Sequence, residues 1–268
     1  MAATIPSSYI ENYSRSLNGI NDRAKAALAA ALARIDYTRP VDEVREAVNA
    51  VMQAACGAST DVTATLAARF YEGLRERMGG GQYTAIADSM RKPEATEGAV
   101  AAFVQVLVDG GEPDELIRKC VGRLDYENRR AAKACMANNA ERDPVRPLYA
   151  LVPTGDETCE YCTILASFGF TANSQVLEHT HENCDCRLIP SWDRKTDIAG
   201  YEDKLDGYRE FYKQITDMRD DPDMPFELAV RIETAKARHA AGLEDGTVSA
   251  KWGSLNELAI IARWIRSH

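Results

Sequence analysis

Two short clusters of cysteine and histidine constrain this chain more than any other feature of its sequence. The first is Cys159-x-x-Cys162, and the second, one short segment later, is His181-x-x-Cys184-x-Cys186. A C-x2-C pair on a tight turn directs two sulfurs at one point. A second cluster that returns beside it completes the four tetrahedral ligands that Zn2+ prefers. The spacing therefore predicts a structural zinc knuckle.

The motif offers five candidate ligands for four positions. Cys159, Cys162 and Cys184 are assigned first, and the fourth position goes to His181 or Cys186. His181 and Cys184 are three residues apart and can share one face of a helical turn. Cys184 and Cys186 would point to opposite sides of an extended segment, so that only one of them would face the metal. The preferred set is therefore Cys159, Cys162, His181 and Cys184, with Cys186 in reserve.

The alternative is that these cysteines are reduced core residues or form disulfides. Reduced core cysteines are expected in apolar runs, where Cys56, Cys120 and Cys135 lie, whereas the cysteines of the motif sit among acidic residues. The ligand spacing favours the metal.

The charge balance limits the partners that this chain can have. The net charge of -9 and a pI near 5.1 argue against a protein whose main work is non-specific binding to phosphates. No secretory leader opens the chain, and no apolar run is long enough to cross a bilayer. We therefore expect a soluble protein without a membrane partner, made in a cytoplasm, where free thiols and a bound metal are favoured over disulfides.

Residues 1–145 predict a helical N-terminal domain. Apolar residues recur at helical spacing in several stretches, and prolines and glycines separate them. Gly57 is expected to end the second helix, and Ser59, Thr60 or Asp61 to cap a third. The expected limits of the remaining helices are a break at Arg39-Pro40, a flexible link at Gly79–Gly81, a helix over 94–108 and a helix from Pro113 to Ala140.

A short basic patch, Arg129, Arg130 and Lys133, lies near the end of this domain. Local charge runs are weak signals, so a solvated helix face is favoured over a DNA contact.

Residues 146–195 predict the knuckle itself. A short strand over 148–152, a short helix opened by Cys159 and a strand over 186–190 make a unit too small to stand without its metal, so metal binding and folding should be one equilibrium. Residues 196–268 predict C-terminal helices, and the first carries an aromatic stripe that should pack on its own core. The fold class is mainly α, with a helical N-terminal domain, a small α+β zinc knuckle and C-terminal helices.

Known catalytic metal motifs do not fit the chain. The H-x-E…P-C-x-x-C pattern of zinc deaminases and the H-E-x-x-H of zincins are both missing from the sequence. A zinc-bound thiolate is not a free nucleophile. We therefore do not expect an enzyme.

The knuckle also resembles a known family over about forty residues. The matching stretches are VPTGDETCEYC (152–162), LASFGF (165–170) and HENCDCRLIPSW (181–192). They are similar to the C-x2-C followed by H-x2-C-x-C-R of MuF-like minor head proteins, the head morphogenesis proteins of tailed bacteriophages. The resemblance makes Cys159, Cys162, His181, Cys184 and Cys186 the metal-site positions of this chain.

The resemblance implies a minor capsid protein of the virion, present in the host cytoplasm during assembly. Its implied partners are portal and capsid proteins, with local contact to phage DNA left open, and its role is in head assembly and DNA packaging or ejection. Two other functions stay open: a phage-encoded metal-dependent enzyme or effector acting on host nucleic acid or protein, and a zinc module contacting DNA, which the acidic balance disfavours. The sequence says nothing of the oligomeric state.

Overall fold

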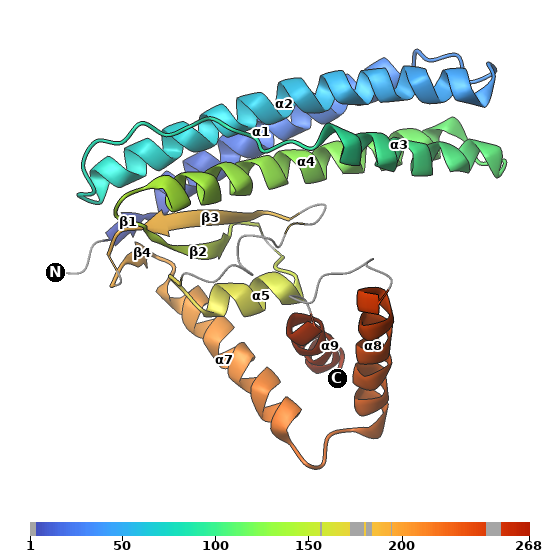
Figure 1. Cartoon of the computed structure of the whole chain (residues 1–268). Coiled ribbons are helices and arrows are strands. Elements are labelled where there is room, and N and C mark those ends of the chain that lie inside the picture. Colours follow the sequence, from blue (N-terminus) through green and yellow to red (C-terminus); the bar gives the residue numbers. More distant parts are fainter. Residues whose placement is uncertain (1–3, 156, 172–179, 181–183, 194, 245–252) are drawn as a thin grey trace. The chain divides into compact units, whose positions relative to one another are not determined.

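A computed structural model of the chain describes residues 4–155, 157–171, 180, 184–193, 195–244 and 253–268. The predicted mainly α fold class is confirmed (Figure 1). The chain divides into two compact units. The helical unit comprises Ser8–Pro147 with Thr180–Cys184, and the mixed unit comprises Met1–Ser7, Leu148–His179 and Asp185–His268. The three-part division predicted from the sequence stays a prediction.

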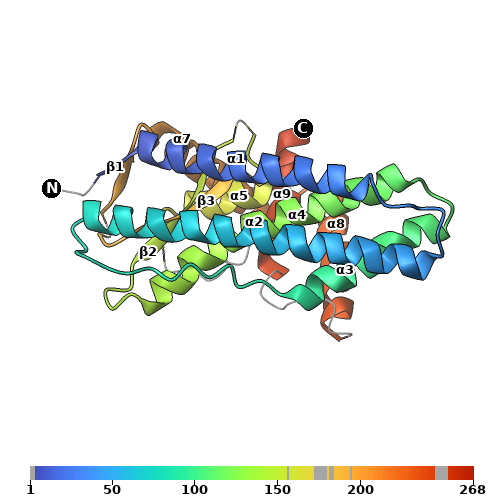
Figure 2. The ribbon, with the colours of Figure 1, turned by 90° about the horizontal axis from the view of Figure 1, so that it is seen from above.

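Four helices build the described part of the helical unit, and their ends follow the punctuation of the sequence. Pro93 and Pro113 each occupy the first turn of a helix, where the missing N–H has no intrahelical partner to lose. The long helices lie side by side in both views, with α1 and α2 antiparallel (Figures 1 and 2). The helices are α1 (Ser7–Leu32), α2 (Val41–Arg77), α3 (Pro93–Val108) and α4 (Pro113–Arg142).

Part of the core of this unit is one apolar cluster to which all four helices contribute. Within each helix its members recur at four-residue steps, as expected for one buried face. They are Leu28, Leu32, Val44, Val48, Met52, Cys56, Val100, Val104, Leu116, Cys120 and Leu124.

The expected break at Gly57 is wrong, because α2 runs without interruption for 37 residues. An interior glycine costs a helix only about 1 kcal/mol relative to alanine, which the packing of so long a helix outweighs. The expected cap at Ser59, Thr60 or Asp61 is also wrong, because all three lie inside α2. The Thr60 hydroxyl donates to the main-chain oxygen of Cys56 at 2.7 Å, a bond made inside a continuous helix.

The glycine run ends α2 as expected, but the link that follows it is held along its length rather than loose. Arg75 donates to the main-chain oxygens of Gly81 and Gln82 at 2.7 and 3.1 Å. Further along, Asn139 of α4 exchanges two hydrogen bonds with the main chain of Ile86, at 2.8 and 2.9 Å. Side chains of α2 and α4 thus fix the path of the link to α3.

A buried ion pair ties the end of α2 to the end of α4. Arg75 donates to both carboxylate oxygens of Asp143, at 2.7 and 3.2 Å, and both residues are almost fully buried. Tyr71 donates to the same carboxylate at 3.0 Å, and burial raises the pKa of its phenol, so the hydroxyl keeps its proton. The carboxylate is therefore compensated by a bidentate cation and a neutral donor.

In the mixed unit, β2 (Leu148–Pro153) and β3 (Cys186–Ser191) pair antiparallel, with Leu148 opposite Ser191 and Pro153 opposite Cys186. The short helix α5 (Glu160–Ser167) packs against β2. These elements lie where the sequence predicted them. A second, parallel pair joins β1 (Thr4–Pro6) to β4 (Asp197–Ala199) and was not foreseen, because three-residue strands carry no readable periodicity.

After Tyr201, the described residues form three further helices of this unit: α7 (Glu202–Asp220), α8 (Phe226–Glu244) and α9 (Gly253–Ser267). The aromatic stripe of α7 packs on its own unit as predicted. Ile215 is fully buried, and Tyr212 meets Phe168 edge to face at 5.3 Å between ring centroids. Within the described residues, no helix is both long and apolar enough to cross a membrane.

Replacing Arg75 by methionine should lower the free energy of unfolding by about 3–5 kcal/mol, because the buried Asp143 carboxylate loses its counter-charge. Urea denaturation followed by circular dichroism measures the change. Arg69→Met, at an exposed position on the same helix, is the matched control and should change stability by less than about 0.5 kcal/mol. Equal effects of the two substitutions would contradict the role given to the ion pair.

Candidate metal centre

The first part of the site is the beginning of α5. Cys159 is extended (φ -66°, ψ 162°) and caps the helix: its sulfur accepts the main-chain N–H of Cys162 at 3.4 Å, and its carbonyl accepts that of Thr163 at 2.9 Å. A side chain that accepts a free N–H at the first turn stabilises the start of a helix. The cap places Cys162 in the first turn of α5, where its side chain is 1% exposed.

The second part is the start of β3, held in place by the turn after β2. Thr154 donates from its main-chain N–H and from its hydroxyl to the carbonyl of Asp185, at 3.3 and 2.5 Å. Gly155 lies so close that a Cβ at this position would be 2.8 Å from the Asp185 carboxylate, so a larger residue would have to displace that side chain. The turn thereby fixes the residue that separates Cys184 from Cys186.

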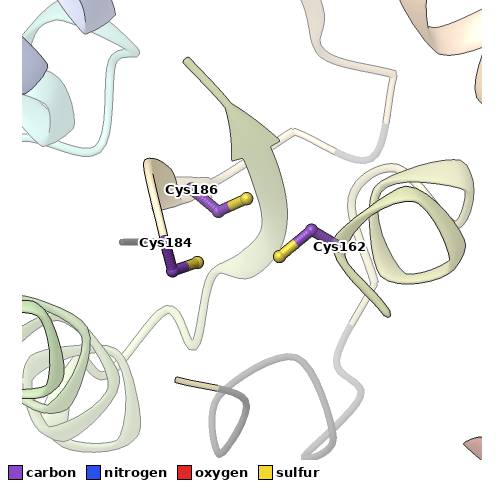
Figure 3. A group of neighbouring side chains, drawn as sticks. All are labelled: Cys162, Cys184 and Cys186. Atoms are coloured by element: carbon purple, nitrogen blue, oxygen red, sulfur yellow. The ribbon is translucent and has the colours of Figure 1, made fainter. Parts of the chain in front are cut away.

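Three cysteines come together here, as Figure 3 shows. The sulfurs of Cys162, Cys184 and Cys186 lie within 4.8 Å of one another, and the three residues are 1%, 2% and 5% exposed. Their side chains point toward a common space from α5 on one side and from the start of β3 on the other. All three are free thiols. Three soft donors buried around one point are the ligand set expected for Zn2+ or another soft divalent ion.

The other buried cysteines have a different environment. Burial raises the pKa of Cys56 to about 11 and that of Cys120 to about 12, and it also raises the pKa of Cys135. These thiols therefore keep their protons at neutral pH and act as small apolar side chains. The interpretation of all three as reduced core residues is confirmed.

The structure brings together three of the five predicted ligands. Cys159 is not one of the clustered residues, and its sulfur caps α5. His181 lies outside the described residues. The alternation argument gave only one of Cys184 and Cys186 a place at the metal, yet both are in the cluster, since the extended strand begins at Cys186 and Cys184 precedes it. The identity of the fourth ligand stays a prediction.

Two residues of the basic patch contact Cys184, which the sequence did not reveal. Lys133 is 3% exposed, and its Nζ lies 3.6 Å from the Cys184 sulfur. The Arg129 guanidinium donates to the Cys184 carbonyl. The solvated face expected for this patch is therefore wrong for both residues. The sequence did carry one signal for this arrangement: Asp125, Arg129 and Lys133 are spaced four residues apart, which puts an acid and two bases on one face of α4.

An aromatic side chain of the mixed unit also lies near the cluster. Burial raises the pKa of Tyr201, and the neighbouring Tyr208 and the sulfurs of Cys186 and Cys162 raise it further. The Tyr201 phenol therefore remains neutral.

The carboxylate nearest the clustered thiols along the chain is already engaged. Asp185 lies 3.8 Å from the guanidinium of Arg187, which is 4% exposed, and packs against Gly155. The cluster itself is buried and rich in sulfur, a donor set that structural zinc sites commonly have.

Together, the fold and the cluster define a mainly helical protein with a small cysteine-rich knuckle that can hold a metal ion. The model of the VG15 protein family matches residues 4–215, a range that includes all four motif cysteines. The chain therefore belongs to the VG15 family and is a phage-encoded protein. Searches of curated proteins and of solved structures gave no match.

The purified protein should carry about one zinc per chain, and Cys162→Ser, Cys184→Ser and Cys186→Ser should each reduce that content below about 0.2, because a site with two thiolates holds zinc poorly. Plasma mass spectrometry of dialysed protein measures it. Cys56→Ala removes a buried thiol outside the cluster and should leave the zinc content unchanged. Retention of zinc by all three serine variants would contradict the site.

Removal of the metal should loosen the knuckle and leave the helical core intact, because binding and folding are coupled only where the ligands lie. Under chelation, amides of α5 and β3 should exchange with deuterium at least about ten times faster. Amides in the middle of α2 serve as the internal control. Identical exchange in α5 and β3 with and without chelator would show that the fold does not need the ion.

Proposed function

We propose that this protein is a structural component of the phage particle: a minor capsid or head morphogenesis protein that associates with the portal and acts in head assembly and in DNA packaging or ejection. The cysteine cluster serves as its structural zinc site, and the protein has no enzymatic turnover.

One observation carries this proposal. Cys162, Cys184 and Cys186 belong to the C-x2-C and H-x2-C-x-C-R elements that resemble MuF-like head proteins, and their sulfurs meet at one buried point. Membership of a phage protein family supports the same assignment. The match of pattern and geometry favours a knuckle built for stability, with zinc holding short segments that have little core of their own.

The environment of the basic residues argues against DNA as the main partner. Arg129 is paired with Asp125, and Lys133 is buried against Cys184, so neither cation is displayed to a phosphate backbone. The net charge of -9 also argues against DNA as the main partner. Portal and capsid proteins are therefore the partners that we propose.

The protein should be found in purified phage particles and should co-purify with the portal. Mass spectrometry of gradient-purified, nuclease-treated particles measures its presence, and affinity capture from infected cells tests the portal contact. A phage-encoded non-structural protein of similar size serves as the carry-over control. Abundance in the lysate together with depletion from the particles, equal to that of the control, would overturn the proposal.

An enzymatic role has a separate test. If the metal site acted on a substrate, Asp185→Asn would abolish an activity while zinc stayed bound. We expect no such zinc-retaining loss of function, because this carboxylate is occupied by Arg187 and the turn at Gly155.

A further inference from the structure

The strongest unassigned feature of the molecule is the buried lysine of α4. Lys133 is 3% exposed, and its ammonium lies 3.6 Å from the sulfur of Cys184. Burying an ammonium group is costly unless negative charge or hydrogen-bond acceptors compensate it. A thiolate at this distance supplies both, whereas a protonated thiol supplies only a weak acceptor.

The position of Cys184 relative to Lys133 is fixed by Arg129, which lies one helical turn earlier on α4. Arg129 donates to the carbonyl of Cys184, and its own charge is compensated by Asp125, whose two oxygens accept at 2.7 and 3.1 Å. Asp125 is in turn held by Asn21 of α1 at 2.5 Å. The backbone of Cys184 is therefore anchored to α4 by contacts that do not involve the metal.

A divalent ion bound by these cysteines would leave negative charge at the cluster, which an adjacent ammonium can compensate. Three thiolates around a divalent ion leave one net negative charge in a buried place, and four thiolates leave two. One ammonium beside the cluster offsets a larger share of the charge in the first arrangement than in the second. At low dielectric a charge this close has a large effect on the stability of the site.

We propose that Lys133 belongs to the outer coordination sphere of the metal centre. Its ammonium donates an N–H···S hydrogen bond to the Cys184 thiolate, and its charge tunes the site for a divalent ion held by three thiolates and one neutral ligand. The inference rests on the metal centre of the proposed function and adds to it a specificity-determining residue and the charge type of the fourth ligand.

Zinc affinity of the full-length protein tests the role of the charge. Lys133→Met keeps the length of the side chain and removes its charge, and it should weaken zinc binding at least about tenfold, the range typical of lost outer-sphere partners. Lys133→Arg keeps the charge and should stay within about threefold of the wild type. Lys119→Met, which removes an exposed lysine of the same helix, is the matched control. Competition with a chromogenic chelator gives the dissociation constants, and circular dichroism confirms that each variant is folded.

A folded Lys133→Met variant that binds zinc as tightly as Lys119→Met would overturn the proposal, as would a Lys133→Arg variant that is folded and equally impaired. If Lys133 only filled space, the opposite pattern would be expected: methionine would be tolerated at this position and arginine would not.

A second measurement needs no variant at Lys133. Cobalt substituted into the wild-type site should show sulfur-to-cobalt charge-transfer absorption of an intensity that corresponds to three thiolates, and Cys159→Ser should leave that intensity unchanged. Four thiolates, or a loss of intensity in Cys159→Ser, would refute the charge assignment. Neither the zinc affinities nor the cobalt spectrum depends on incorporation into particles, so this inference and the structural role in the virion can fail separately.

Discussion

Three thiols buried within 4.8 Å of one another are the constraint around which the knuckle is built. As bare thiolates they would repel one another in a buried place, and a divalent cation turns that repulsion into attraction. The local structure serves this arrangement: the Cys159 cap sets the start of α5, the pairing of β2 with β3 sets Cys186 opposite Pro153, and Gly155 lets the chain pass close to Asp185.

The helical unit buries several charged and polar side chains. Arg75 and Asp143 close its end, and Asp125, Arg129 and Lys133 run along one face of α4 toward Cys184. Such groups contribute little net stability when paired and cost several kcal/mol when one partner is lost. Their value here lies in position: each fixes a segment with little apolar surface of its own, the link after α2 in one case and the backbone at Cys184 in the other.

The sequence predicted most of the helices and the main strands because their apolar periods are long and their ends carry proline or glycine. It failed at Gly57, where packing along a 37-residue helix outweighed one weak residue, and at β1 and β4, which are too short to show a pattern. Ligand spacing identified the cysteine cluster. It could not identify Lys133, because a buried cation is read as a surface charge until the acceptor that compensates it is known.

Zinc K-edge X-ray absorption of the purified protein tests the central claim most directly, since it reports the atoms around the ion itself. The account predicts one zinc site with three sulfur neighbours at about 2.3 Å and one lighter neighbour near 2.0–2.1 Å. A shell of oxygen and nitrogen alone, which would place the ion away from the cysteines, would contradict it.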